Sequence, residues 1–480
     1  MIPTKRSVKK YSFKSPNLTR LRELGSLVTS PGGFRDRHGR LLDILKIKVE
    51  KGILETLVQF YDPAYHCFTF VDYQLVPTLE EYSYWVGLPV PDKEPFNGLE
   101  LTPKTSIIAA ALHLKPSEMV PPNFIIKGGF QGLTANFLYK KASAFAKDKK
   151  TSAFESIIAL LIYGLVLFPN FDNFVDLNAI KIFLSKNPVP TLLADTYHSI
   201  HYRTIKKDGT ILCCAPLLYK WFTSHLPQSI FSKANTGRSL WSQRIMPLTP
   251  DDIVWYHAAG DAGVVIDSCG EFQNVPLIGR YGGITYNPAL AMRQFGYPMK
   301  EKPNNLSLSG EFYLNDKDYA NMRTKFVQAW HTVRKLDRNQ LGKKSNFAHP
   351  SYTQWVIDRA VSFGLPYTLP RSLSSTIPHA SLPLPPCTQD EYQERLAESS
   401  HESGTWKRKY HEAMLKMETM SGQLEQNDHQ FLKQRRQMIE RDELLLVKDR
   451  LLDRYANKKK RMDFFSGTHS DSDDPPTSRA

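Results

Sequence analysis

The sequence predicts a mostly α-helical protein: a compact multi-helix domain with a minor β-hairpin, a proline-rich linker and a C-terminal coiled coil. Three observations predict this class. Apolar residues recur at helical spacing, strand-like runs are few and interrupted by glycines, and a strict seven-residue apolar repeat runs near the C-terminus. We expect five parts in chain order: a basic, partly disordered arm (1–40), an α-helical body (41–363), a proline-rich linker (364–388), a coiled coil (389–461) and a disordered acidic tail (462–480).

The positive charge of the chain is concentrated in two segments. Residues 1–50 hold 12 Lys/Arg and four Asp/Glu, and residues 431–461 hold 11 and five, so their net charges are +8 and +6. Together they equal the net charge of +14 of all 480 residues, so we expect the remaining surface to be neutral overall. Such clusters act as nuclear import signals or bind phosphate backbones, and the alternative is an ordinary solvated charge run.

The cysteines and the apolar runs indicate a soluble, intracellular protein. Five cysteines are odd in number and lack paired CxxC spacing, which argues against a secreted disulfide framework. The basic N-terminus lacks the apolar segment of a signal peptide. The most apolar run, residues 157–168, has twelve residues, fewer than the ~20 that cross a bilayer, so we expect it to be a buried central helix.

Two capping signatures mark helix starts in the body. Thr78 with Glu81 predicts a capping box for a helix that ends at Gly87, because a hydroxyl and a carboxylate three residues apart satisfy the first free backbone N–H groups. Ser152 with Glu155 predicts a second capping box at the start of the most apolar run.

Strand signals are sparse. Residues 264–266 and 275–284 predict a small hairpin, and the segment Arg280-Tyr281-Gly282-Gly283 predicts a turn, because it lacks the strand-to-helix frame of a phosphate-binding loop. Long helices are expected at about residues 316–336 and 351–363. Six prolines between Gly364 and Thr388 then predict a semi-extended linker.

The coiled-coil prediction rests on a repeat that spans six heptads without a proline. A straight α-helix drifts by about 20° per heptad, so an unbroken seven-residue series implies supercoiling against another helix. We therefore predict a homo-oligomer, most simply a dimer. The expected seam consists of Tyr410, Met417, Leu424, Phe431, Met438, Leu445 and Leu452.

A coiled coil needs a second apolar position in each heptad, here three residues after each seam residue, and this position becomes polar along the predicted coil. It is apolar as far as Met420 but polar or charged from Asn427 onward. Either the seam shifts phase after Leu424 or the C-terminal half is weak, and Asn427 could fix the register. The alternative to a coiled coil is a long solvated helix that folds back on the body.

A compact basic run lies at the end of the predicted coil. It consists of Lys458, Lys459, Lys460 and Arg461, and acidic residues follow it in the tail. This run predicts a nuclear import signal or a nucleic-acid patch.

One group of residues could bind a metal ion. Asp195, His198 and His201 lie at i, i+3 and i+6 of an expected helix, and Cys213 follows shortly after. The two histidines could coordinate zinc with the cysteine as a third ligand. We favour the alternative, ordinary core and surface histidines, because no fourth ligand is evident.

The sequence contains no recognisable catalytic motif. GxGxxG, P-loop, GxSxG and HExxH patterns are all absent. We therefore assign no catalytic, cofactor-binding or metal-binding residue and expect the protein not to be an enzyme.

Five segments of the body carry a resemblance to a known family: residues 61–90, 153–176, 187–201, 216–227 and 271–299. Together they resemble an uncharacterised plant-specific domain family that is abundant in legumes and often ends in a coiled coil. That family in turn resembles the plant mobile domain of transposon-derived and host nuclear proteins, which is sometimes labelled "aminotransferase-like". The resemblance implies an origin near mobile elements and nuclear residence, but no catalytic residues, since no Schiff-base lysine or phosphate cup can be assigned.

These observations predict a non-catalytic nuclear interaction or scaffold protein that oligomerises through its coiled coil and binds a nuclear protein partner. The alternative is a retroelement-derived protein that binds nucleic acid through basic arms on phosphates. Neither reading involves a membrane or a cofactor.

Overall fold

A computed structural model of the protein describes residues 6–90, 95–98, 100–206, 209–231, 240–255, 264–272, 274–299, 319–345 and 347–367. The predicted coiled coil and acidic tail lie outside these residues, as does nearly all of the linker, so these predictions stay predictions. The same holds for the seam residues Tyr410, Met417, Leu424, Phe431, Met438, Leu445 and Leu452, and for the basic run of Lys458, Lys459, Lys460 and Arg461.

The described residues form a mixed α/β body, so the prediction of a mostly α-helical fold is wrong. Their strands form five small sheets, whereas the sequence predicted one hairpin. The strands are two to six residues long, and several are buried at every position. Such strands lack the polar and apolar alternation that identifies a strand in a sequence.

The stretch predicted to be a basic arm is built into the body from Arg6 onward. β1 (Tyr11–Phe13) pairs in parallel with β8 (Gly209–Ile211), with Tyr11 opposite Gly209. α1 (Thr19–Gly25) and α2 (Pro31–His38) follow, and their apolar side chains Leu21, Leu24 and Phe34 are buried. Burial of these side chains gives this stretch the apolar contacts that an arm would lack.

The next part of the chain forms one half of the predicted Thr78–Glu81 capping box, because the Glu81 carboxylate accepts from the Thr78 hydroxyl rather than from its backbone N–H. The N–H of Glu81 donates to the Thr78 hydroxyl at the start of α5, and Gly87 ends this helix with a φ of 71°. A side chain at Gly39 would lie 2.5 Å from the Val86 carbonyl oxygen, so glycine lets α2 meet the end of α5. The elements here are α3 (Leu41–Lys46), α4 (Lys51–Val58), the antiparallel strands β2 (Tyr61–Asp62), β3 (Cys67–Thr69) and β4 (Gln74–Leu75), and α5 (Leu79–Val86).

The most apolar run forms the centre of the core, as predicted. It lies in α8 and continues into one π-helical turn, η2, and residues 157–168 are all buried. The predicted capping box at its start is wrong: Ser152 lies inside α8, and the Glu155 carboxylate pairs with Arg37 instead. The elements are α6 (Thr105–Ala111), η1 (Pro116–Glu118), β5 (Phe124–Lys127), β6 (Phe130–Thr134), α7 (Ala135–Lys147), α8 (Thr151–Ile162), η2 (Tyr163–Leu167), β7 (Phe174–Asp176) and α9 (Leu177–Ser185).

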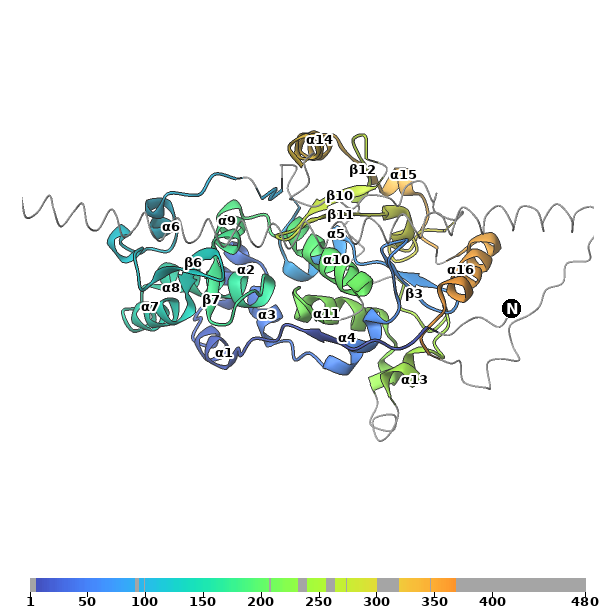
Figure 1. The fold of residues 1–480 in the computed structure, drawn as a ribbon, viewed down its shortest axis with the longest axis horizontal. Coiled ribbons are helices and arrows are strands. Elements are labelled where there is room, and N and C mark those ends of the chain that lie inside the picture. Colours follow the sequence, from blue (N-terminus) through green and yellow to red (C-terminus); the bar gives the residue numbers. More distant parts are fainter. Residues whose placement is uncertain are drawn as a thin grey trace, which may run out of the picture. The chain divides into compact units, whose positions relative to one another are not determined.

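The hairpin predicted from residues 264–266 and 275–284 is correct only for the second segment, where β10 and β11 pair and lie on α10 (Figure 1). β9 does not join this hairpin but pairs with β12, about 65 residues further along the chain. The elements are α10 (Val189–Lys206), α11 (Ala215–His225), η3 (Gln228–Phe231), α13 (Trp241–Ile245), β9 (Val264–Cys269), β10 (Val275–Ile278), β11 (Gly283–Tyr286) and η5 (Pro288–Ala291).

The last described helix is joined to the sheet of β2, β3 and β4. The Arg359 guanidinium of α16 donates two hydrogen bonds, of 2.6 and 2.7 Å, to the buried Asp62 carboxylate of β2. The predicted helix at 351–363 matches α16, whereas the one at about 316–336 ends early because its last part is β12. The elements are α14 (Tyr319–His331), β12 (Val333–Asp337), α15 (Arg338–Leu341) and α16 (Pro350–Phe363).

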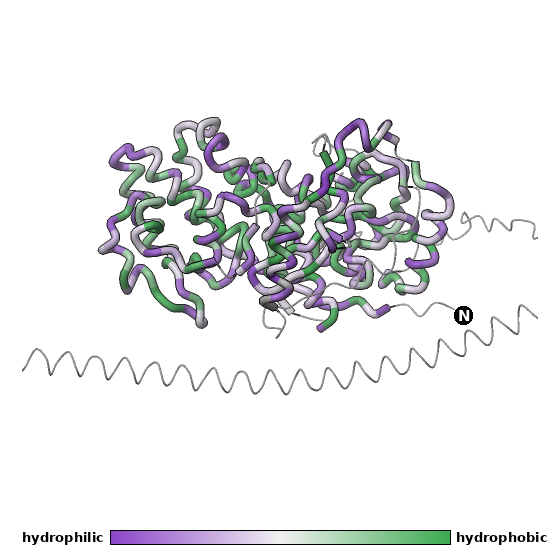
Figure 2. Tube along the Cα trace, turned by 90° about the horizontal axis from the view of Figure 1, so that it is seen from above, coloured by the Kyte–Doolittle hydropathy of each residue, from purple (hydrophilic) through white to green (hydrophobic). Residues whose placement is uncertain are grey.

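Hydrophobic and hydrophilic residues alternate along the helices of the body (Figure 2), as expected where a helix has one buried and one exposed face. Among the described residues, no helix combines the length and the apolar character needed to span a bilayer.

Candidate functional site

Arg280 is the centre of a buried ionic cluster that joins the β10–β11 turn to α10. Its Nε donates to Asp195 Oδ2 at 2.7 Å, and its backbone N–H donates to Asp195 Oδ1 at 2.8 Å. Both side chains are 1% exposed. A Cβ added at Gly279 would lie 2.4 Å from Asp195 Oδ1, so this glycine allows the turn to approach the helix.

The same guanidinium also reaches the end of η2 and the start of α9. Nη1 donates to the Phe168 carbonyl at 2.8 Å and lies 3.4 Å from Asp176 Oδ2, while the other Asp176 oxygen caps α9. Burial lowers the pKa of Arg280, but the carboxylates of Asp195 and Asp176 more than reverse this and hold it above its ordinary value. Arg280 therefore stays charged and connects four elements inside the core.

The residues considered as metal ligands have other partners. Asp195 is bound to Arg280, and His198 lies against Gly282, where a Cβ would be only 2.2 Å from its Nε2. His201 points elsewhere, with its Nδ1 3.4 Å from the Tyr61 hydroxyl. The helical spacing therefore does not bring Asp195, His198 and His201 to one metal position.

Cys213 is a buried thiol of the core. Burial raises its pKa well above the ordinary value, and the same holds for its neighbour Cys214, so neither thiol ionises readily. In the described parts of the chain, no three His, Cys, Asp or Glu side chains are grouped so that they could hold a metal ion.

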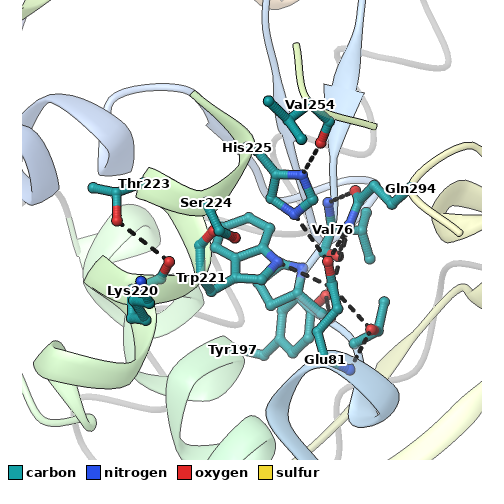
Figure 3. Close-up of polar contacts among 12 residues, drawn as sticks. Val76, Glu81, Tyr197, Lys220, Trp221, Thr223, Ser224, His225, Val254 and Gln294 are labelled. Atoms are coloured by element: carbon teal, nitrogen blue, oxygen red, sulfur yellow. Dashed lines mark hydrogen bonds and ion pairs between the residues drawn. The ribbon is translucent and has the colours of Figure 1, made fainter. Parts of the chain in front are cut away.

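A second buried cluster surrounds Glu81 of α5 (Figure 3). Glu81 Oε2 accepts from the Thr78 hydroxyl at 2.8 Å and from Trp221 Nε1 at 3.0 Å. Glu81 Oε1 lies 2.8 Å from His225 Nε2, and Gln294 Nε2 donates to both carboxylate oxygens at 3.2 and 3.3 Å. Neither oxygen of this buried carboxylate lacks a partner, as a stable buried charge requires.

Glu81 and His225 form a buried hydrogen-bonded pair. His225 Nδ1 lies 2.9 Å from the Val254 carbonyl oxygen, which only accepts, so Nδ1 carries a proton. The 2.8 Å contact between Nε2 and Glu81 then needs a second proton on one of the two groups. The side chains of His225 and Glu81 are 1% and 5% exposed, so this pair has no access to a substrate and joins α5 to α11.

The serine beside this pair does not act as a nucleophile with it. The Ser224 hydroxyl donates to the Trp221 carbonyl at 2.6 Å, as serines inside helices commonly do. A Ser–His catalytic pair would need that hydroxyl to face the imidazole.

Glu80, next to Glu81, gives the fold a pH dependence. Burial raises the pKa of Glu80 from 4.5 to about 7, although Oε1 accepts a hydrogen bond of 2.8 Å from the Ile266 N–H. A carboxyl whose pKa is raised by folding stabilises the fold fully when the pH is below the pKa of the unfolded chain. This contribution is lost as the pH rises through the folded pKa of about 7.

We expect Glu80→Gln to be less destabilising, or more stabilising, at pH 8.5 than at pH 4.5, because glutamine keeps the acceptor for Ile266 and does not ionise. The difference should reach at most roughly 3 kcal/mol in the free energy of unfolding. Urea unfolding of both proteins at the two pH values measures it. An equal effect at both pH values would show that Glu80 ionises in the folded state as it does in the unfolded state.

Two hollows open on the surface of the described body. The larger, of about 700 Å³, lies between α1 and α7. Residues with polar side chains line it, but most of its exposed wall is formed by their apolar atoms. The smaller, of about 390 Å³, lies along α11 and includes Lys220, Ser224 and Val254. The larger is lined by Asn17, Thr19, Arg20, Glu23, Asn136, Tyr139 and Asn173.

Sequence reasoning missed the two buried clusters because their partners are distant in the chain. Arg280 and Asp195 are 85 residues apart, and Glu81 and His225 are 144 apart. The available signal was a single arginine in a run of apolar residues and glycines, which is unusual unless the charge has a buried partner.

The body matches the family model described as "Domain of unknown function (DUF7745)" over residues 21–361. The chain belongs to this family. The match begins within α1 and ends within α16, so it covers both buried clusters and most of the body. No curated protein and no solved structure matches the chain.

Proposed function

We propose that the protein is a non-catalytic interaction module of the nucleus that oligomerises through residues 389–461. The heptad repeat from Tyr410 to Leu452 carries this proposal, because an apolar seam of that length needs a helical partner. The proposal is supported by the titratable groups of the two buried clusters, which stabilise the fold. Arg280 and Glu81 bind buried partners that join core elements, and neither borders the two surface hollows.

We also propose that the family is related to the plant mobile domain and has an origin near mobile elements. The segment that carries this similarity is α5 with its cap and stop, where Thr78 starts the helix and Gly87 ends it against Arg40. The relation is what suggests nuclear residence, together with the basic run at residues 458–461.

The coil should make the protein a homo-oligomer, most simply a dimer, because an isolated single-seam helix is marginal in water. Multi-angle light scattering of the full chain and of a chain ending at residue 386 measures this. We expect the full chain to have twice the mass of one chain and the shortened one to be a monomer. Two monomers at micromolar concentration would contradict self-association through the coil.

Replacement of Lys458, Lys459, Lys460 and Arg461 by alanine should leave a fluorescent fusion largely cytoplasmic, whereas the wild-type fusion enters the nucleus. The change removes four charges and no predicted seam residue, so oligomerisation should persist and serves as the control. The N-terminal basic cluster of Lys5, Arg6, Lys9 and Lys10 could also direct import. Equal distribution of both fusions, even after these four residues are replaced as well, would contradict charge-directed import.

A second candidate function is nucleic-acid binding, and one observation favours it. Residues 101–150 hold eight Lys/Arg and only two Asp/Glu, and most of these lysines are exposed around α6 and α7. Affinity for phosphates should fall steeply with salt, whereas helix packing with a protein partner should change little. Salt titration of the complexes recovered from nuclei therefore separates the two candidates.

A further inference from the structure

We propose that the groove between α1 and α7, together with an exposed stripe of α7, binds single-stranded nucleic acid through its phosphates. This inference rests on the second candidate function and gives it a site. The two helices lie at the same end of the body (Figure 1). The groove measures about 700 Å³, within the ~300–1,000 Å³ of pockets that hold small ligands.

The groove holds a guanidinium that is oriented before any ligand binds. The Arg20 guanidinium lies 4.5 Å from the centre of the Tyr139 ring, and its Nη1 donates to Asn136 Oδ1 at 3.3 Å. A planar guanidinium fixed in this way can present its remaining N–H groups to two phosphate oxygens. Asn17 and Asn173 add carboxamide donors to the same walls, and Glu23 adds one carboxylate.

The groove continues into a basic stripe on α7. Asn136, Lys140, Ser143 and Lys147 are exposed and fall at i, i+4, i+7 and i+11, which places them on one face of the helix. The opposite face, with Leu138 and Ala142, is buried. Lys140 and Lys147 are two turns apart, about 10 Å along the axis, so they can contact different phosphates of one strand.

The lysines of this stripe are not neutralised by neighbouring acids. Lys141 pairs with Glu118 and Lys150 with Asp148. No ion pair involves Lys140 or Lys147 within the described part of the body. The positive charge of this face is therefore available to a polyanion.

The shape and chemistry favour a single strand and a sequence-independent contact. A duplex is too wide to enter a hollow of this volume and could only touch its rim. Tyr139 is 5% exposed and Arg20 lies over its ring, so this aromatic face is not available for stacking a base. The contacts should therefore go to phosphates, whose binding is strongly salt-dependent.

The test uses the full chain in which Lys458, Lys459, Lys460 and Arg461 are replaced by alanine, so that the C-terminal run does not contribute. The probe is a fluorescent oligothymidine of about 12 nucleotides, within the ~4–16 of known single-strand sites. Its anisotropy is measured over a series of salt concentrations. Each phosphate contact on a single strand contributes a slope of about 0.7 to log K against log salt.

We expect Lys140→Gln with Lys147→Gln to reduce the slope by about 1.4 and to weaken binding roughly 25-fold at about 0.1 M salt. Arg20→Ala, which tests the groove itself, should weaken binding as well. The matched control is Lys325→Gln with Lys343→Gln, which removes the same charge from exposed positions on and beyond α14 and should change the affinity less than about twofold. Circular dichroism checks that each variant is folded.

Three outcomes would overturn the proposal. If the parent binds but the α7 and control variants behave alike, the site is wrong while nucleic-acid binding stands. If the parent does not bind at all, both the site and the second candidate function fall. Tighter binding of a duplex of equal length, or of polyglutamate, would reject the single-strand assignment.

Discussion

We expect Arg280→Met to lower the free energy of unfolding by about 3–5 kcal/mol, the range for breaking one partner of a buried ion pair. The substitution keeps the apolar stem but leaves Asp195 and Asp176 as buried carboxylates without their cation. It also removes the donor to the Phe168 carbonyl at the end of η2. Chemical denaturation at pH 7 measures the loss.

The loss should shrink at acid pH. Burial raises the pKa of Asp195 above its unfolded value of 3.8, and removing the opposing Arg280 charge raises it further. Such a carboxyl favours the fold most when the pH is below its pKa in the unfolded chain, and least once the pH exceeds its pKa in the folded protein. The variant should therefore be closer in stability to the wild type near pH 4 than at pH 7.

A matched control comes from the surface. Arg334 pairs with Asp267 at 3.6 Å, and their side chains are 66% and 39% exposed. Arg334→Met should change the free energy of unfolding by at most about 1 kcal/mol, because water and salt screen an exposed pair. If Arg280→Met were equally mild at pH 7, the buried cluster would not hold the β10–β11 turn on α10.

The elements that the sequence predicted correctly are those whose signals are local. Thr78 starts α5 and Gly87 ends it, each through contacts within one helical turn, and Gly364 ends α16 in the same way as Gly87. The continuous apolar character of residues 157–168 likewise predicted their burial, because a helix that is apolar on all sides has no exposed face. Such signals need no knowledge of the tertiary structure.

The predicted fold class was wrong because most of the strands give no local signal. β2 and β4 have two residues each, shorter than the four to eight that a period of two needs to be visible. β1 and β8 pair across about 200 residues, so only the tertiary structure shows that the N-terminal segment is a strand. The sequence pattern there shows basic residues and little periodicity.

The candidate sites were hidden for two different reasons. Asp195 was considered only as a possible metal ligand, because two histidines follow it at helical spacing. Its actual partner, Arg280, is 85 residues away in the chain. The basic face of α7 was missed because the net charge was summed over the whole body. Residues 51–100 hold two Lys/Arg and eight Asp/Glu, a net charge of −6 that cancels the +6 of residues 101–150. A charge sum over the whole body therefore showed nothing.

Leu161→Asp should unfold the body. Leu161 is fully buried in α8, and its neighbours from Ile157 to Ile162 are buried as well. The loss of the apolar side chain costs about 2–5 kcal/mol in the free energy of unfolding. The new carboxyl is also buried among apolar side chains of the helix, which offer it no hydrogen-bond donor or cation. The total approaches the 5–15 kcal/mol by which most domains are stable. We expect loss of the cooperative thermal transition.

Two further variants separate burial from the mere presence of an aspartate. Leu161→Ala should remain folded but lose about 2–5 kcal/mol, which gives a measurable value if the aspartate variant cannot be purified. Leu101→Asp introduces the same side chain where leucine is 92% exposed, and its midpoint should shift little. A folded Leu161→Asp protein with an unchanged midpoint would show that α8 is not the centre of the core. The cause of any unfolding is assigned to burial only if Leu101→Asp melts like the wild type, because both variants carry the same new charge.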